Sequence, residues 1–228
     1  MLTTHSLLER TLGHKKRAIR KGAILKVEGD TSRQTFYVRE GWLAASQSLP
    51  DGDRQILEFV LPGETYDPTG ADGRTSFVKI EAPCEAVVVA MDTSAWTRLL
   101  QDHPDLWLEE RRAANAVQAR RAERMLRMGK SSAETRIAYV LIELYLRLSK
   151  GEPSEKHGFH VPLTQKDLGD YAGLSSVHVC RTLRRLSRQG VITTGDHMNI
   201  CVHDMSTLAD LADVDLGTLR REIVPTSA

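Results

Sequence analysis

The stretch from Leu163 to Gly190 constrains the fold most, because it predicts two short helices joined by a glycine turn. Thr164 can cap the first helix and the serines at 175–176 the second, since a side-chain oxygen at that position accepts a backbone N–H of the first turn. Gly173 permits the positive φ of a tight turn, and Gly169 lets the two helices approach closely. Apolar residues recur at helical spacing in both segments: Leu168 and Ala172, then Val179, Leu183 and Leu186. Because the residues after Gly190 predict a β-hairpin, the unit is expected to be a winged helix-turn-helix.

The charge of the second helix indicates what that helix binds. It carries four arginines with no acidic residue among them: Arg181, Arg184, Arg185 and Arg188. Their spacing gathers them on the side opposite the apolar residues. A solvated helix face is the ordinary interpretation of such a charge run, but the caps, the turn and the hairpin lie in register around it. The sequence therefore predicts that a recognition helix at about residues 175–189 binds double-stranded DNA.

Residues 17–89 predict strands. Short apolar stretches alternate with turn residues, among them the Asp51-Gly52 pair that is typical of hairpins. Closely spaced turns with strands between them indicate an all-β sandwich or barrel. The expected fold class is therefore α+β, with a first domain at 1–103 and helical segments after it.

A long helix is predicted next, because residues 105–127 contain no Gly or Pro. Pro104 suits its first turn and Gly129 its end. An irregular apolar stripe runs along it: Leu106, Ala113, Val117 and Met128, with Ala114 and Met125 beside them. Such a stripe suits a two-fold partner helix, and packing against the chain's own β domain is the alternative. We predict a dimerisation helix over 104–130 and a homodimer.

A further helix is predicted to begin at Ser131-Ser132, where Ser131 has capping-box spacing to Glu134. Its apolar residues recur at helical intervals from Ile137 to Leu148 and predict one buried face. Residues 149–160 are rich in Gly, Pro, Ser and charge and predict a loop, with a metal pair at its two histidines, His157 and His160, as the alternative. Residues 131–228 are expected to form the DNA-binding domain.

Composition excludes several classes of protein. The net charge is only +1, so a nucleic-acid surface has to come from local clustering. No apolar run could span a membrane, and residues 1–17 lack the order of a secretion signal. The three cysteines, Cys84, Cys180 and Cys201, fit a reduced cytoplasmic protein and cannot supply the four thiolates of a usual iron–sulfur cluster. We expect no enzyme activity and no cofactor.

Motifs in both halves of the chain resemble the CRP/FNR transcription regulators. In the first half they are the glycine-containing turns within 21–30, 37–41 and 53–64; in the second, residues 163–168 through 181–183. The motif Ser-Val-His-Val-x-Arg-Thr-Leu is similar to that of a proteobacterial branch of the family without an established ligand. The resemblance implies a cyclic-nucleotide-binding-like β-roll (a jelly roll), a dimerisation helix and a homodimer on a palindromic site. RNA polymerase is an implied partner if the protein activates transcription.

The departures from the family pattern concern both the effector and the bases that are read. Arg74 and Thr75 stand where cyclic-AMP-binding members have an arginine and a serine, but the Gly-Glu pair expected before them is missing. The N-terminal cysteine set of oxygen-sensing members is also absent. We therefore predict that neither cyclic AMP nor an iron–sulfur cluster is bound, and Arg74 and Thr75 remain as candidate effector contacts.

Within the recognition helix, Val177 stands where the family has a glutamate; it cannot accept a hydrogen bond from cytosine N4 but can contact a thymine methyl. Arg181 is the candidate for a guanine contact. The remaining candidates, which are expected to contact DNA or the phosphates beside it, are Ser175, Ser176, His178, Arg184 and Arg185.

Two other classes of function are alternatives to a DNA-binding regulator. A haem or other ligand sensor could use the same fold. A cupin-like enzyme needs clustered histidines, and residues 17–90 contain none. Cys180 precedes Arg181 in the recognition helix and is either a small packing residue or a redox-sensitive thiol.

Overall fold

The computed structural model describes residues 16–149, 157–195 and 198–225 and divides into two compact units, residues 1–112 and 113–227. The division falls within one long helix, and each unit has its own core. The division predicted from sequence, at residues 103 and 130, separates the parts by expected role and stays a prediction.

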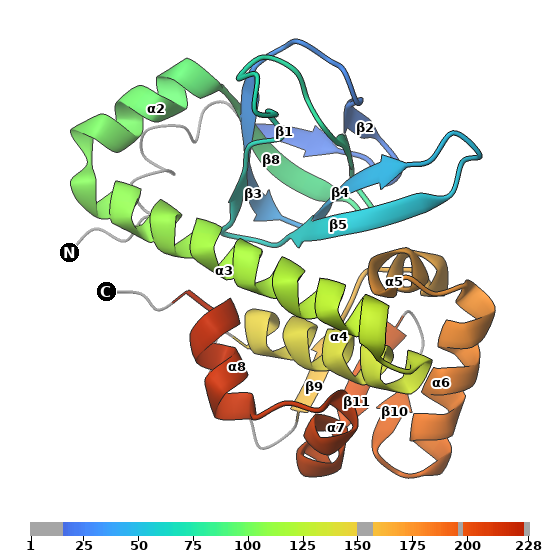
Figure 1. Ribbon diagram of the computed structural model, residues 1–228. Helices are drawn as coiled ribbons and strands as arrows, with labels where there is room; N and C mark the ends of the chain where they lie inside the picture. The colour runs from blue at the N-terminus through green and yellow to red at the C-terminus, as the bar shows by residue number, and fades with distance from the viewer. Residues whose placement is uncertain (1–15, 150–156, 196–197, 226–228) are drawn as a thin grey trace. The chain divides into compact units, whose positions relative to one another are not determined.

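The first unit is a pair of antiparallel four-stranded sheets (Figure 1, blue to green). One sheet has the order β1-β8-β3-β6 and the other β2-β7-β4-β5. The strands are β1 (Lys16–Ile19), β2 (Ile24–Lys26), β3 (Gln34–Glu40), β4 (Leu43–Ser48), β5 (Arg54–Val60), β6 (Thr65–Tyr66), β7 (Lys79–Glu81) and β8 (Ala86–Asp92). The predicted hairpin turn at Asp51-Gly52 joins β4 to β5, and Gly52 has a φ of 94°.

Two apolar clusters hold the first unit together. One draws residues from both sheets and includes Phe36, Leu43 and Val88. The other joins β3 and β8 to the helix α2 (Thr93–Asp102) and the start of α3 (Pro104–Lys130) through Trp96 and Leu106. The predicted β-roll followed by helices is confirmed, and the α+β class with it.

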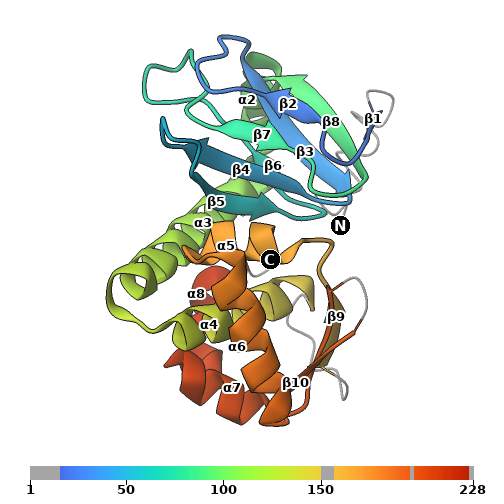
Figure 2. The ribbon, with the colours of Figure 1, turned by 90° about the vertical axis from the view of Figure 1, so that its right-hand side faces the viewer.

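The second unit surrounds one central helix, α4 (Ala133–Leu148), which Figure 2 shows among its neighbours. The other elements are α5 (Gln165–Ala172), α6 (Ser176–Arg188), α7 (Met205–Ala212), α8 (Leu216–Ile223) and a sheet of β9 (His157–His160), β10 (Ile192–Thr194) and β11 (Asn199–Val202) in the order β10-β11-β9. Every residue of α4 from Ile137 to Arg147 is buried. The prediction of one buried face was wrong, because α5, α6, α7, α8 and β9 all contact this helix.

Residues 157–160 are a strand, so the predicted loop over 149–160 was wrong in this part; residues 150–156 lie outside the described residues. Phe159 pairs with Ile200, and its ring lies 5.8 Å from that of Tyr145. A strand forms here because β11 supplies backbone partners and α4 an apolar contact, and neither can be recognised within the segment itself.

The predicted apolar stripe on the long helix is corrected as well. Leu106 is buried in the core of the first unit, while Val117 and Met128 are half-buried. Two residues of the predicted stripe, Ala114 and Met125, are exposed, and the other large exposed apolar side chains of α3 lie outside the stripe: Trp107, Leu108 and Leu126. The face of α3 that packs within the second unit is built from arginines, which sequence periodicity places among the polar residues.

One of those arginines, Arg124, belongs to a buried ionic cluster around Glu143 of α4, whose side chain has no exposed surface. Arg124 donates from Nη1 to both carboxylate oxygens at 2.9 Å, and Arg147 donates from Nη1 at 3.3 Å. The hydroxyl of Tyr171 in α5 donates to the same carboxylate at 2.6 Å. Glu143 therefore links α3 to the first helix of the helix-turn-helix across α4.

Two further arginines of α3 bind the ends of the last two helices. Arg120 donates to the carbonyl of Ile223 at 2.9 Å, and Arg127 donates to that of Ala212 at 3.2 Å. Carbonyls at a helix C-terminus have no partner within the helix and carry the negative end of its dipole. The guanidinium groups satisfy these carbonyls inside the protein.

Candidate nucleic-acid interface

The turn between α5 and α6 has the geometry that the sequence predicts. Thr164 and Asp167 form a capping box at the start of α5. Gly173 ends the helix with a φ of 66°, a conformation that favours glycine. A Cβ on Gly169 would lie 2.4 Å from the carbonyl oxygen of Leu174, so glycine alone allows this approach. The two glycines thus allow the chain to turn tightly from α5 into α6.

The second helix separates its apolar and charged faces. Ser175 caps α6 by accepting the N–H of His178, and its hydroxyl also lies 2.8 Å from His178 Nδ1. The buried residues of α6 are Val179, Thr182, Leu183 and Leu186. This face contacts α4 and α5, so the opposite face is presented to solvent.

The exposed face carries all seven residues that the sequence predicts for DNA contact: Ser175, Ser176, Val177, His178, Arg181, Arg184 and Arg185. Arg188 is exposed beside them. Val177 is 55% exposed, which is unusual for a valine and leaves its methyl groups available. Cys180 is half-buried at the border of this face. Its redox role stays a prediction.

One partner of this face was not predicted from sequence. Glu134 of α4 accepts a hydrogen bond of 3.0 Å from Arg185. The two residues are 51 positions apart, and the capping-box spacing of Glu134 suggested only a local role. Ser132, not Ser131, caps α4, accepting the N–H of Thr135.

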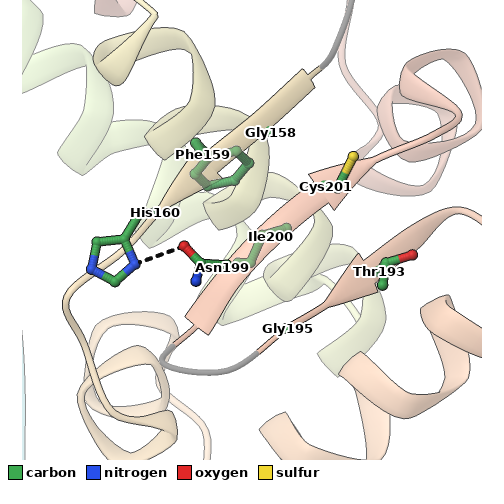
Figure 3. A pocket seen from close by; sticks show the side chains of 8 residues that line it. All are labelled: Gly158, Phe159, His160, Thr193, Gly195, Asn199, Ile200 and Cys201. Carbon is green, nitrogen blue, oxygen red and sulfur yellow. Dashed lines mark hydrogen bonds between the residues drawn. The ribbon is translucent and has the colours of Figure 1, made fainter.

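Residues of the wing sheet line a hollow, and Figure 3 shows how their side chains lie. The hollow is about 430 Å³ and is open to solvent; the residues that line it include Gly158, His160, Thr193 and Asn199. His160 Nδ1 lies 3.1 Å from Asn199 Oδ1, so the described partner of this ring is an amide. The side chain of His157 lies outside the described residues, and within them no cluster of three metal-ligating side chains occurs.

The candidate effector residues of the first unit already have an acceptor. Asp72 accepts the backbone N–H groups of Arg74 and Thr75 at 2.9 and 3.0 Å, and the Thr75 hydroxyl at 2.6 Å. The Thr75 hydrogen bonds lower the pKa of Asp72 to about 2, with a further contribution from the Arg74 N–H. Asp72 is therefore an anion at every physiological pH, and it accepts the backbone N–H groups of both residues and the Thr75 hydroxyl.

Comparison with known families decides the identity of the two units. Residues 16–103 match the family model of the cyclic nucleotide-binding domain, and residues 135–211 match that of the Crp-like helix-turn-helix domain. The chain belongs to the CRP/FNR family. CRP/FNR proteins are transcription regulators that bind DNA through this helix-turn-helix, and that is the function of the chain.

Relatives within the CRP/FNR family cover most of the chain. The nitrogen fixation regulation protein FixK of Bradyrhizobium diazoefficiens is 28% identical over 82% of this chain and 75% of its own. The transcriptional activator Anr of Pseudomonas aeruginosa is 28% identical over 78% of this chain and 72% of its own. The solved structure of FixK2 from Bradyrhizobium japonicum has a TM-score of 0.76 at 22% identity, covering 88% of this chain and 98% of that one. The FixK2 structure shares the fold of this chain.

Among the helices of the described residues, none has the length and apolar character that a membrane span requires.

Proposed function

We propose that the protein is a homodimer that reads a two-fold symmetric DNA site with the exposed face of α6. The observation that carries this proposal is the concentration of four exposed arginines on the face of α6 opposite its buried residues. Arg181 contacts a guanine edge, Val177 lies against a neighbouring base, and Arg184 and Arg185 bind phosphates. The serines at 175–176 and His178 fix the start of the helix at the backbone. Selection of bound sequences from a random duplex pool tests the proposal, because it has to return an inverted repeat.

The oligomeric state follows from the exposed face of α3. Leucine, methionine and tryptophan side chains are exposed on this one long helix and suit contact with a second copy of it. Burying such a side chain would stabilise the dimer by about 1.5–3 kcal/mol. Two half-sites about one helical turn apart then match two copies of α6. In this proposal residues 104–130 carry the dimer contact, 1–103 the sensor and 131–228 the DNA contact.

Replacing Met125 and Leu126 together by glutamate is expected to give a monomer at micromolar concentration. Four new carboxylates would face one another across the dimer, and the apolar contact would be lost. Light scattering measures the mass, and footprinting measures whether one or both half-sites are protected. Leu49→Glu is the matched control, because Leu49 is an equally exposed apolar residue on the β4–β5 turn and not on α3. A dimeric double variant would contradict the proposed interface.

Cyclic AMP is not the effector in this proposal. The Asp72 carboxylate accepts the backbone N–H of Arg74 and the Thr75 hydroxyl, so an anionic effector at these groups would lie beside a second negative charge. Millimolar cyclic AMP is therefore expected to leave the DNA affinity unchanged, measured by fluorescence anisotropy, and to give no calorimetric binding signal. A tenfold change in affinity would contradict this.

In this proposal the protein regulates transcription without enzyme activity and without a resident cofactor. Anr is described as an activator, and contact with RNA polymerase is proposed here only for the case that this chain activates too.

A further inference from the structure

The four arginines of the exposed α6 face differ in their salt bridges. Arg185 is bound to Glu134, whereas no salt bridge to Arg181, Arg184 or Arg188 occurs within the described part of the chain. Arg185 is nevertheless 60% exposed, so the ion pair fixes one edge of its guanidinium and leaves the other edge open to solvent. A guanidinium carries five N–H donors in a planar fork, so one edge can bind a carboxylate while the other binds a phosphate.

Glu134 is itself held firmly. It lies in the first turn of α4, where the helix dipole stabilises a negative charge. Its second carboxylate oxygen is buried with no hydrogen-bond partner in the described residues, so the Arg185 guanidinium is the side-chain partner described for this carboxylate. Two residues further on, Arg136 donates to the carbonyls of Ser131 and Gly173 at 3.1 and 3.3 Å. These bonds tie the first turn of α4 to the turn between α5 and α6.

We infer that Glu134 is a positioning residue for DNA recognition: it holds the Arg185 guanidinium in the one orientation that meets a phosphate when α6 is in its specific register. An arginine fixed in this way loses little side-chain entropy on binding, which corresponds to about a two- to tenfold gain in affinity. A loosely docked, sequence-independent complex gains nothing from the fixed orientation, because its phosphates lie in many positions. Glu134 therefore raises the ratio of specific to non-specific affinity without touching a base.

The test measures the affinity of the full-length dimer for its selected duplex and for a scrambled duplex. Glu134→Gln is expected to weaken binding to the selected duplex by about two- to tenfold per subunit and to leave binding to the scrambled duplex unchanged or tighter. Glu134→Asp keeps the charge but withdraws the carboxylate by one methylene, so it is expected to behave like Glu134→Gln. In an Arg185→Ala background the Glu134→Gln change is expected to have no effect on the ratio.

Asp210→Asn is the charge control, since it removes one exposed carboxylate from α7. Thermal melting of each variant shows whether the unit stays folded. An unchanged ratio in Glu134→Gln would overturn the inference, as would wild-type behaviour of Glu134→Asp or an equal loss in the Arg185→Ala background. The inference rests on α6 being the DNA-reading helix. If the wild-type protein bound the selected and the scrambled duplex equally well, the proposed function itself would be wrong, whatever the Glu134 variants do.

Discussion

Arg181→Ala is expected to abolish sequence-specific binding while leaving most of the affinity for unrelated duplex in place. A bidentate arginine–guanine contact discriminates by about 1–3 kcal/mol, and a dimer makes it twice. The loss of about 2–6 kcal/mol corresponds to binding weakened from roughly thirtyfold to more than ten-thousandfold. Fluorescence anisotropy with the selected and the scrambled duplex, at one fixed salt concentration, measures the two affinities.

Arg184→Ala is the matched control for that experiment. It removes the same charge from the same exposed face but is proposed to lose only a phosphate contact. Its expected effect is equal weakening on both duplexes, with the salt slope reduced by about 1 per subunit. Equal losses on both duplexes for both variants would contradict the assignment of Arg181 to a base.

Glu143→Gln is expected to lower the free energy of unfolding of the second unit by about 3–5 kcal/mol, the usual effect of removing one partner from a buried ion pair. The carboxylate has no exposed surface and lies among Arg124, Arg147 and the Tyr171 hydroxyl. For a unit of this size the melting temperature should fall by roughly 10 °C or more. Denaturant unfolding followed by circular dichroism measures the change.

Asp210→Asn serves as the surface control, because an exposed substitution without a buried contact changes stability by about 0.5 kcal/mol or less. A similar stability change in both variants would show that Glu143 contributes no more than a surface charge. DNA affinity of the folded fraction adds a second measurement. Glu143 joins α3 to α5, so its loss is expected to weaken DNA binding even at temperatures where the unit is folded.

The helix-turn-helix could be predicted from sequence because its determinants are local. The caps at Thr164 and Ser175 and the glycines 169 and 173 act on neighbouring backbone, and the structure has each of them in its expected role. Local signals also placed the β4–β5 turn and the long helix α3.

The features that could not be predicted depend on contacts between distant segments. Glu143 and Arg147 look like the solvent side of an amphipathic helix, and only their partners from α3 and α5 explain their burial. The ion pair of Glu134 with Arg185 and the strand β9 likewise need a partner about 40 or more residues away. Periodicity identifies which residues share a face but not whether a charged face is buried.

The pairing of β9 with β11 affects how the DNA-binding unit can form. Val202 of β11 lies opposite His157 of β9. The whole helix-turn-helix lies between these two strands in the sequence. Bringing β9 and β11 together costs chain entropy before the contacts of the sheet can stabilise the unit. Contacts between residues so far apart in the sequence slow folding. The helix-turn-helix and its wing are therefore expected to fold together as one cooperative unit. A fragment that begins after residue 160 would keep every side chain of the recognition helix but lose the edge strand that completes the sheet beside it.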